Sequence, residues 1–348
     1  MTYSPIPNPQ KGYLLFDDGT KFEGVVFSEG DACQAEVVFN TALLGYSEVL
    51  TDPSYQGQVV VFSAPMIGTY GWNREDMQSP RITVSGVIVN EYSDAPYSLA
   101  KVLKENAVLG IEQIDCRKLI KYIRERGCIK GIITTQPNGV YNIIHSTEKK
   151  SPNTKVLKLE NDSATYHLGV LDFGIKSSIL TELKKRKCRF SILPWDITLD
   201  QLKELKIDGI VLSNGPDDPR DYMDSIPHLN TILETYPSLG ICLGHQLIAL
   251  ALGATIEKLP FGHHGTNQPV LDLNTEKIII SSQNHNYTIA KDSIENLPIK
   301  ATHLNLIDNS IAGIAHHSLP IISVQFHPEA APGTSDAKEI FNKFITLL

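Results

Sequence analysis

Gly240-Ile241-Cys242-Leu243-Gly244 stands between an apolar run that predicts a β-strand and a segment, Gln246 to Leu252, whose spacing predicts a helix. A strand that turns at once into a helix crowds the backbone, so residues without a Cβ are needed on both sides of the central one. This arrangement is typical of a nucleophile. Cys242 is expected to project its thiol, exposed, above the sheet, and the helix N-terminus favours the thiolate. The alternative is a small buried residue in a tight turn.

The segments before this turn alternate between strand and helix patterns. Such alternation predicts an α/β fold with a central, mostly parallel sheet flanked by helices and joined by right-handed crossovers. Strands are predicted at 168–173, 190–193 and 210–212, with helices at 179–183 and 199–205.

The segments after the turn predict a more antiparallel arrangement, with strands at 277–281, 311–315 and 321–325. Ser335 is expected to cap a final amphipathic helix. The residues that this helix would turn inward are Ile340, Phe341, Phe344 and Ile345.

The first half of the chain has a mixed pattern that predicts an α+β domain. Short apolar runs on both sides of Asp18-Gly19 predict a hairpin, helical spacing follows at 98–106 and 115–126, and 129–135 predicts a strand. The polar segment 145–165 has no periodicity and contains Ser151-Pro152-Asn153. We therefore predict an amino-terminal domain at 1–155 and a carboxy-terminal domain at 156–348.

Composition narrows the classes of function. A chain of 348 residues is long enough for two domains, and its 31 basic against 39 acidic residues give a net charge of −8, which argues against nucleic-acid binding. No stretch is apolar over the length of a membrane span, so we expect a cytoplasmic protein. The five cysteines are widely separated, which favours reduced thiols over a disulfide framework or a zinc site.

Phe326-His327-Pro328-Glu329 supplies the partners that a nucleophilic thiol needs. Residues two apart on an extended chain point to the same side, so Glu329 can bind one nitrogen of His327 while the other nitrogen faces a cysteine. Alone, His327 would more often be an ordinary structural histidine. In one domain with Cys242, it predicts a nucleophile, a base and a residue that orients the base.

The turn Leu212-Ser213-Asn214-Gly215-Pro216 follows an apolar strand. Turns at the carboxyl ends of parallel strands face ligands, and a glycine there lets a backbone N–H approach a developing oxyanion. The backbone N–H groups of Gly215 and Leu243 are our candidates for an oxyanion hole, and a plain turn is the alternative.

Together these residues resemble the class I (triad) glutamine amidotransferases, and the first half resembles the amino-terminal domain of carbamoyl phosphate synthetase small subunits. The motifs that carry this resemblance cover nearly the whole chain. They are Phe39-Asn40-Thr41, Gly45-Tyr46, Leu50-Thr51-Asp52-Pro53-Ser54-Tyr55, Asp115-Cys116-Arg117-Lys118-Leu119, Asp172-Phe173-Gly174-Ile175-Lys176, Phe261-Gly262-His263-His264-Gly265, Gln283-Asn284-His285 and His327-Pro328-Glu329-Ala330.

The resemblance implies a glutaminase with Cys242 as nucleophile, His327 as general base and acid, and Glu329 as the residue that orients His327. It also implies that L-glutamine is contacted by Ser54, Gly215, Leu243, Gln246 and Asn284. No phosphate-binding loop is present, so no cofactor is expected on this chain. The resemblance implies a heteromer in which a large synthetase subunit binds ATP, Mg²⁺ and bicarbonate and receives ammonia. His263 and His264 have no metal-ligand spacing and are interpreted as structural loop residues.

The chain departs from the family at Asp217, where SNGPGDP has glycine, and at Asn286 and Tyr287, where NHGF is usual. Phe326 also stands where glycine is common. Asp217, Asn286 and Tyr287 are counted with the predicted glutamine pocket. A carboxylate at 217 could raise the thiol pKa or pair with the substrate's α-ammonium, so we expect altered glutamine use.

Two other functions fit the sequence. One is a non-catalytic assembly subunit of an ammonia-dependent synthetase, suggested by Asp217 and Asn286. The other is an amidotransferase subunit that serves another acceptor. The pathway supplied, pyrimidine or arginine biosynthesis, is not decided by these motifs.

Overall fold

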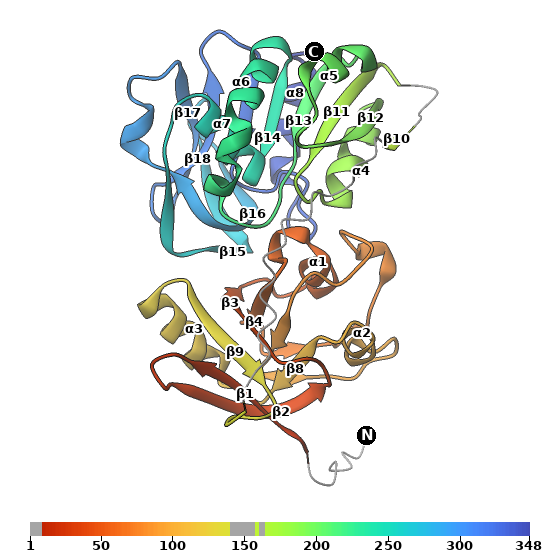
Figure 1. The fold of residues 1–348 in the computed structure, drawn as a ribbon, viewed down its shortest axis with the longest axis vertical. Helices are drawn as coiled ribbons and strands as arrows, with labels where there is room; N and C mark the ends of the chain where they lie inside the picture. Colours follow the sequence, from red (N-terminus) through yellow and green to blue (C-terminus); the bar gives the residue numbers. More distant parts are fainter. Residues whose placement is uncertain (1–8, 140–156, 160–163) are drawn as a thin grey trace. The chain divides into compact units, whose positions relative to one another are not determined.

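The computed structural model describes residues 9–139, 157–159 and 164–348 (Figure 1). Contacts divide the chain into two compact units. The first holds Met1–Thr51 and Tyr55–Glu148, and the second holds Asp52–Ser54 and Lys149–Leu348. The boundary predicted at residue 155 lies outside the described residues.

The first unit is built around a closed barrel whose strands follow the order β1-β2-β8-β6-β4-β3-β9. The predicted hairpin is confirmed as β1 and β2, with Lys11 opposite Val25. The predicted helices and strand are confirmed as α2, α3 and β9, and the side chains of Ser98 and Asp115 cap the two helices. The barrel itself was not predicted, because its closure depends on pairing between strands far apart in sequence, such as β1 with β9.

The elements of this first half are β1 Lys11–Phe16, β2 Lys21–Ser28, β3 Cys33–Asn40, α1 Tyr46–Thr51, η1 Pro53–Tyr55, β4 Gln58–Phe62, β5 Met66–Ile67, η2 Arg74–Asp76, β6 Gly86–Ile88, β7 Glu91–Tyr92, α2 Leu99–Glu105, β8 Leu109–Glu112, α3 Cys116–Arg126 and β9 Ile129–Thr134.

The second unit contains a sheet whose described strands follow the order β10-β12-β11-β13-β14-β19-β18-β16-β15-β17. The neighbours β12, β11, β13, β14 and β19 are mutually parallel, as the alternation predicted. From β18 onward the pairing is antiparallel, also as predicted.

The elements of the second half are β10 Leu157–Leu159, β11 Tyr166–Asp172, α4 Ser177–Lys185, β12 Cys188–Pro194, α5 Leu199–Leu205, β13 Gly209–Leu212, η3 Pro219–Ser225, α6 Ile226–Thr235, β14 Ser238–Ile241, α7 Leu243–Ala251, β15 Ile256–Asp272, β16 Ile278–Ile289, η4 Lys291–Ile294, β17 Ile299–Asn305, β18 Ile311–His316, β19 Ile321–Val324, η5 Asp336–Lys338 and α8 Glu339–Ile345.

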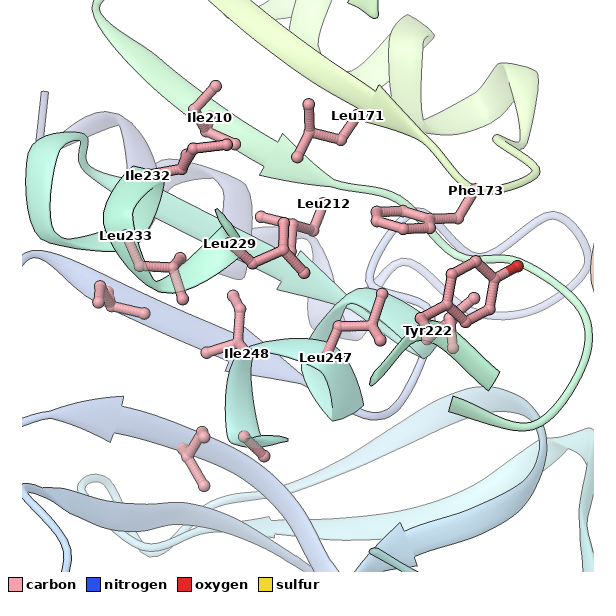
Figure 2. Close-up of a cluster of buried hydrophobic side chains, with 14 of the residues drawn as sticks. Leu171, Phe173, Ile210, Leu212, Tyr222, Leu229, Ile232, Leu233, Leu247 and Ile248 are labelled. Carbon is pink, nitrogen blue, oxygen red and sulfur yellow. The ribbon is translucent and has the colours of Figure 1, made fainter. Parts of the chain in front are cut away.

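Both faces of the parallel part of this sheet are buried. Ile210 and Leu212 of β13 join a core with α5, α6 and α7, while Val211 between them joins a second core with α4 and α8. Figure 2 shows the first core, where Leu229 of α6 and Leu247 of α7 lie against the sheet. Alternating side chains of a strand point to opposite faces, so a continuous apolar run in sequence is what a strand covered on both sides requires.

Two details of the prediction for this half need correction. Ser335 does not cap α8. It precedes the short helix η5 and makes no side-chain cap hydrogen bond, and Lys338 is the residue before α8. The long strand β15 was missed because its polar residues and its glycines at 262 and 265 hide a strand pattern. In the described part of the chain, no helix is long and apolar enough to cross a membrane.

Candidate active site

The candidate site lies at the carboxyl edge of the parallel strands of the second unit. Lys176 follows β11, Gly215 follows β13, Cys242 follows β14 and His327 follows β19. Parallel neighbours end at the same edge of a sheet, and β14 pairs directly with β19. The backbone N–H of Cys242 donates to the Val324 carbonyl at 2.9 Å. Topology therefore brings the nucleophile candidate beside the strand that leads to His327.

The glycines around Cys242 are required by close backbone contacts, as predicted. A Cβ on Gly240 would lie 2.6 Å from the Gly244 carbonyl oxygen, and a Cβ on Gly244 would lie 2.2 Å from the Leu212 carbonyl oxygen. Cys242 itself has φ 54° and ψ −105°, a conformation that a non-glycine residue adopts only at a cost. The strained turn fixes the direction of the Cys242 side chain.

The thiol of Cys242 is buried rather than exposed, since the residue keeps only 2% of its surface. Its Sγ lies 3.5 Å from the Asn284 carbonyl oxygen and 3.8 Å from the Gln325 Nε2. The expectation of an exposed thiol was wrong because it considered the parallel strands alone. β16, far along the chain, supplies Asn284 over the turn.

His327 and Glu329 form the predicted pair, with 2.7 Å between His327 Nδ1 and Glu329 Oε1. The route differs from the prediction. The chain is not extended here, but turns so that the Ala330 N–H donates to the His327 carbonyl at 3.2 Å. Both side chains are fully buried, so each is held without competition from water.

Burial lowers the pKa of His327, but the charges of Glu329 and Cys242 outweigh it and raise the pKa to about 10. Burial raises the pKa of Glu329, and the charges of Lys176 and His327 bring it down to about 2. Nε2 of His327 is buried and has no partner at normal hydrogen-bond distance among the described residues, but the ring interacts with the Cys242 side chain closely enough to help raise the pKa of His327. A thiolate–imidazolium pair requires a charged imidazolium beside the thiol, with one N–H that is free to donate to the sulfur. His327 meets this requirement through Nε2.

Lys176 is a charged residue of this site to which the sequence reasoning assigned no role. It is 1% exposed, and its Nζ lies 3.1 Å from Glu329 Oε1, 2.8 Å from the Ala330 carbonyl oxygen and 3.8 Å from Asp52 Oδ2. A buried ammonium is retained where carboxylates balance it. The only sequence signal was its place in the motif Asp172–Lys176, because burial of a lysine has no pattern in the sequence.

The two predicted oxyanion-hole residues lie next to each other. A Cβ on Gly215 would be 2.8 Å from Leu243 Cδ2 and 2.3 Å from the Phe173 carbonyl oxygen. Nearby, Ser54 Oγ accepts a hydrogen bond from Asn214 Nδ2 at 2.9 Å. The structure thus brings Ser54, from far along the chain, to the turn that carries Gly215.

Gln246 joins the turn to strands β16 and β19. Its Nε2 donates to the Tyr287 carbonyl at 2.8 Å and to Gln325 Oε1 at 3.0 Å, and Gln325 in turn contacts the thiol. Asn284 and Asn286 both contact His264, which lies in strand β15 and not in a loop as interpreted from the sequence.

Asp217 has φ 78°, a value that favours glycine. Burial and, next, the charge of Asp217 raise the pKa of Tyr222. The structure places Asp217 in the turn after Gly215. Asn286 lies in β16 two residues after Asn284 and contacts His264 rather than the thiol.

The pair of histidines in β15 does not form a metal site with its neighbours. His263 Nε2 lies 2.9 Å from Asp308 Oδ2, and His264 contacts amide side chains. Among the residues that the structure describes, no group of three or more His, Cys, Asp or Glu side chains could hold a metal ion.

Two family models match the chain, one on each half. Residues 14–133 match the carbamoyl-phosphate synthase small chain, CPSase domain, and residues 169–347 match glutamine amidotransferase class-I. The second match contains Cys242, His327 and Glu329.

Named relatives are similar over nearly the full length of both chains. The carbamoyl phosphate synthase pyrimidine-specific small chain of Bacillus subtilis is 41% identical over 97% of this chain and 96% of its own. The arginine-specific small chain of Halalkalibacterium halodurans is 42% identical over 96% of each, and the small chain of Listeria monocytogenes is 39% identical over 97% of each. This chain therefore belongs to the carbamoyl phosphate synthase small chain family, with a class-I glutamine amidotransferase domain in its second half.

Proposed function

We propose that this chain hydrolyses L-glutamine to glutamate and ammonia for carbamoyl phosphate synthesis, with Cys242 as nucleophile. The Cys242 thiolate adds to the side-chain amide carbon of glutamine, and the imidazolium of His327 protonates the departing ammonia. Water, deprotonated by His327, then hydrolyses the γ-glutamyl thioester and frees the thiol. Glu329 orients His327 through Nδ1 and keeps Nε2 toward the sulfur.

The observation that carries this proposal is the state of His327. Its Nδ1 is held by Glu329 at 2.7 Å, its Nε2 has no partner at normal hydrogen-bond distance among the described residues, and the charge of Cys242 contributes to its raised pKa. His245 Nε2 is also buried without a partner, but no carboxylate holds its Nδ1, and burial lowers its pKa to about 3, so that His245 is neutral. At His327 one donor is left for the sulfur and for a leaving group.

The neighbouring backbone supports the remaining steps. Gly215 and Leu243 are adjacent, and their N–H groups would bind the oxyanion that forms when the thiolate adds to the amide. Gln246, Asn284, Asn286 and Tyr287 lie in one connected set of contacts around Cys242. Ser54 contacts Asn214 beside Gly215, and Asp217 follows Gly215. We assign this set to glutamine binding.

The reaction that consumes the ammonia takes place on another chain. We propose a heteromer in which a large synthetase subunit binds ATP, Mg²⁺ and bicarbonate and uses the ammonia released here, without a cofactor on this chain. Support comes from the membership in a family of small chains and from a sequence without a phosphate-binding loop. A cytoplasmic location remains part of the proposal. Relatives named pyrimidine-specific and arginine-specific are 41% and 42% identical, so identity does not separate the two pathways.

Cys242→Ser tests the function in the complex purified with its large chain. We expect glutamine-supported carbamoyl phosphate formation to be lost, while formation from added ammonium salts is retained. The serine hydroxyl is a poor nucleophile at neutral pH but has almost the volume of the thiol, so the fold is kept. If Cys242→Ser changes neither rate, the chain is a non-catalytic assembly subunit. If the purified large chain makes another product, the acceptor is different.

A further inference from the structure

Strands β15 and β16 carry a short chain of polar side chains beside the thiol. His264 and Asn284 are directly opposite each other in the two strands. His264 Nδ1 lies 2.7 Å from Asn284 Oδ1, and His264 Nε2 lies 2.9 Å from Asn286 Oδ1. The three residues are 2%, 7% and 8% exposed. Their hydrogen bonds are therefore protected from water.

A neutral imidazole has one N–H donor and one acceptor nitrogen, so it cannot donate to both amide oxygens. One amide must therefore present its NH₂ group to the ring. Asn284 Nδ2 is buried and has no partner among the described residues. A half turn of the Asn284 amide matches donors to acceptors at the ring, because Nδ2 then donates to His264 Nδ1 and the His264 Nε2–H donates to Asn286 Oδ1. It also puts the amide oxygen, in place of Nδ2, at the buried position that has no partner among the described residues. The Asn284 oxygen then faces away from the ring.

The Asn286 side chain can accept this hydrogen bond because Gly262 leaves space for it. Gly262, at φ 64°, has no side chain, and a Cβ there would lie 2.3 Å from Asn286 Oδ1 and 2.5 Å from His264 Nε2. The contact between His264 and Asn286 exists only because residue 262 is glycine.

Building on the proposed function, we propose that Asn286 is a positioning residue for glutamine. By accepting the hydrogen bond from His264 Nε2–H, Asn286 fixes the tautomer of the imidazole and leaves the Asn284 amide oxygen as the unfilled acceptor that glutamine would use. The Asn284 main-chain carbonyl oxygen lies 3.5 Å from Cys242 Sγ, so this residue is at the reacting thiol. A side-chain oxygen there suits the α-ammonium or the amide N–H donors of glutamine, and an NH₂ group would oppose them.

Glutamine hydrolysis by the complex, measured as glutamate release, tests this proposal through a double-mutant cycle. Asn284→Ala removes the acceptor, and we expect the KM for glutamine to rise about tenfold with little change in kcat. Asn286→Gly removes the group that fixes the His264 tautomer. The Asn284 amide is then only partly in the orientation that binds glutamine, and we expect the KM to rise about two- to fivefold. The double variant should match Asn284→Ala alone, since Asn286 acts only through Asn284.

Other variants separate this role from a general structural effect. Asn286→Asp still accepts a hydrogen bond, so its KM should lie closer to that of the parent chain than the KM of Asn286→Gly does. Asn309→Gly is a matched control, because Asn309 is exposed at φ 60°. In ¹⁵N spectra of the imidazoles, His264 should be the Nε2–H tautomer in the parent chain and a mixture in Asn286→Gly.

The inference and the proposed function fail in different ways. If the parent complex releases no glutamate from glutamine, the proposed function is wrong. If it does, but Asn286→Gly leaves the KM unchanged or raises it equally with and without Asn284→Ala, only the role of Asn286 is wrong. An Nδ1–H tautomer of His264 in the parent chain would also overturn that role.

Discussion

The two sides of the candidate site are held by different forces. On the Cys242 side the backbone itself is fixed, by glycines at 215, 240 and 244 that touch main-chain oxygens and by the strained cysteine. On the His327 side, Glu329 lies between two buried cations, His327 and Lys176, and contacts both. Substitutions that add volume should disturb the Cys242 side, and substitutions that remove a charge should disturb the His327 side. Single substitutions of each kind test this difference.

Glu329→Gln should have the largest effect. The kcat for glutamine should fall about 10³-fold, within the range of a lost general acid–base arrangement, while ammonia-supported synthesis is kept. Glu329 is the largest of the influences that raise the pKa of His327. Its loss lowers that pKa, so the imidazolium deprotonates at lower pH and the alkaline limb of the pH–rate profile should move to lower pH. An unmoved alkaline limb would show that the charge on Glu329 does not control His327.

The free energy of unfolding should depend on pH through the same two residues, His327 and Glu329. The pKa of His327 is raised to about 10, so its contribution is complete below the ordinary value near 6.5 and is lost as pH rises toward 10. The pKa of Glu329 is lowered to about 2, so its contribution is complete above about 4.5 and is lost as pH falls toward 2. In denaturant unfolding across pH 5–10, the difference between the parent chain and Glu329→Gln should therefore shrink as the pH rises toward 10, and the part that remains is the pair of Glu329 with Lys176. Parallel curves would contradict the assignment.

Lys176→Met should have the next largest effect, which we expect in the free energy of unfolding. It leaves Glu329 and Asp52 without their buried ammonium, which costs about 3 kcal/mol in the free energy of unfolding. Lys203→Met is the matched control, because its ion pair with Asp200 is exposed and such pairs contribute little. Equal losses in the two variants would remove Lys176 from the charged cluster.

Gly215→Ala tests the backbone side. The new Cβ would lie 2.3 Å from the Phe173 carbonyl oxygen, so the turn must move and its N–H with it. We expect kcat for glutamine to fall about 10²-fold, the cost of one oxyanion donor, without a shift of the pH profile. Gly139→Ala is a milder comparison, since its Cβ would have 3.3 Å or more to its neighbours. A shifted pH profile in Gly215→Ala would show that the two sides are not independent.

Asp217→Gly should have the smallest effect. Relief of the left-handed backbone should stabilise the chain by less than about 1 kcal/mol, because aspartate tolerates this region better than most residues. The glutamine KM should change as well, since the carboxylate lies in the turn after Gly215. Thermal unfolding and glutamine kinetics give the two readouts, and an unchanged KM would exclude Asp217 from the binding site.

The reacting residues of the site could be predicted from the sequence because each lies in a short, recognisable sequence pattern. The turn around Cys242 and the His327-Pro328-Glu329 run each carry their chemistry within a few residues, and strand and helix alternation gave the parallel sheet. Lys176 could not be given a role, because the partners that make a buried lysine stable are 124 and 153 residues away, at Asp52 (176 − 52) and Glu329 (329 − 176).

By itself, the sequence determined which residues can act as nucleophile, base and orienting carboxylate, and which half of the chain holds them. The tertiary structure alone decided that the thiol is buried under β16, that Glu329 reaches His327 through a turn, and that His264 links Asn284 to Asn286. The reason is physical. Residue types and short-range spacing fix what a group can do, whereas burial and the state of a proton depend on neighbours that only long-range strand pairing brings together.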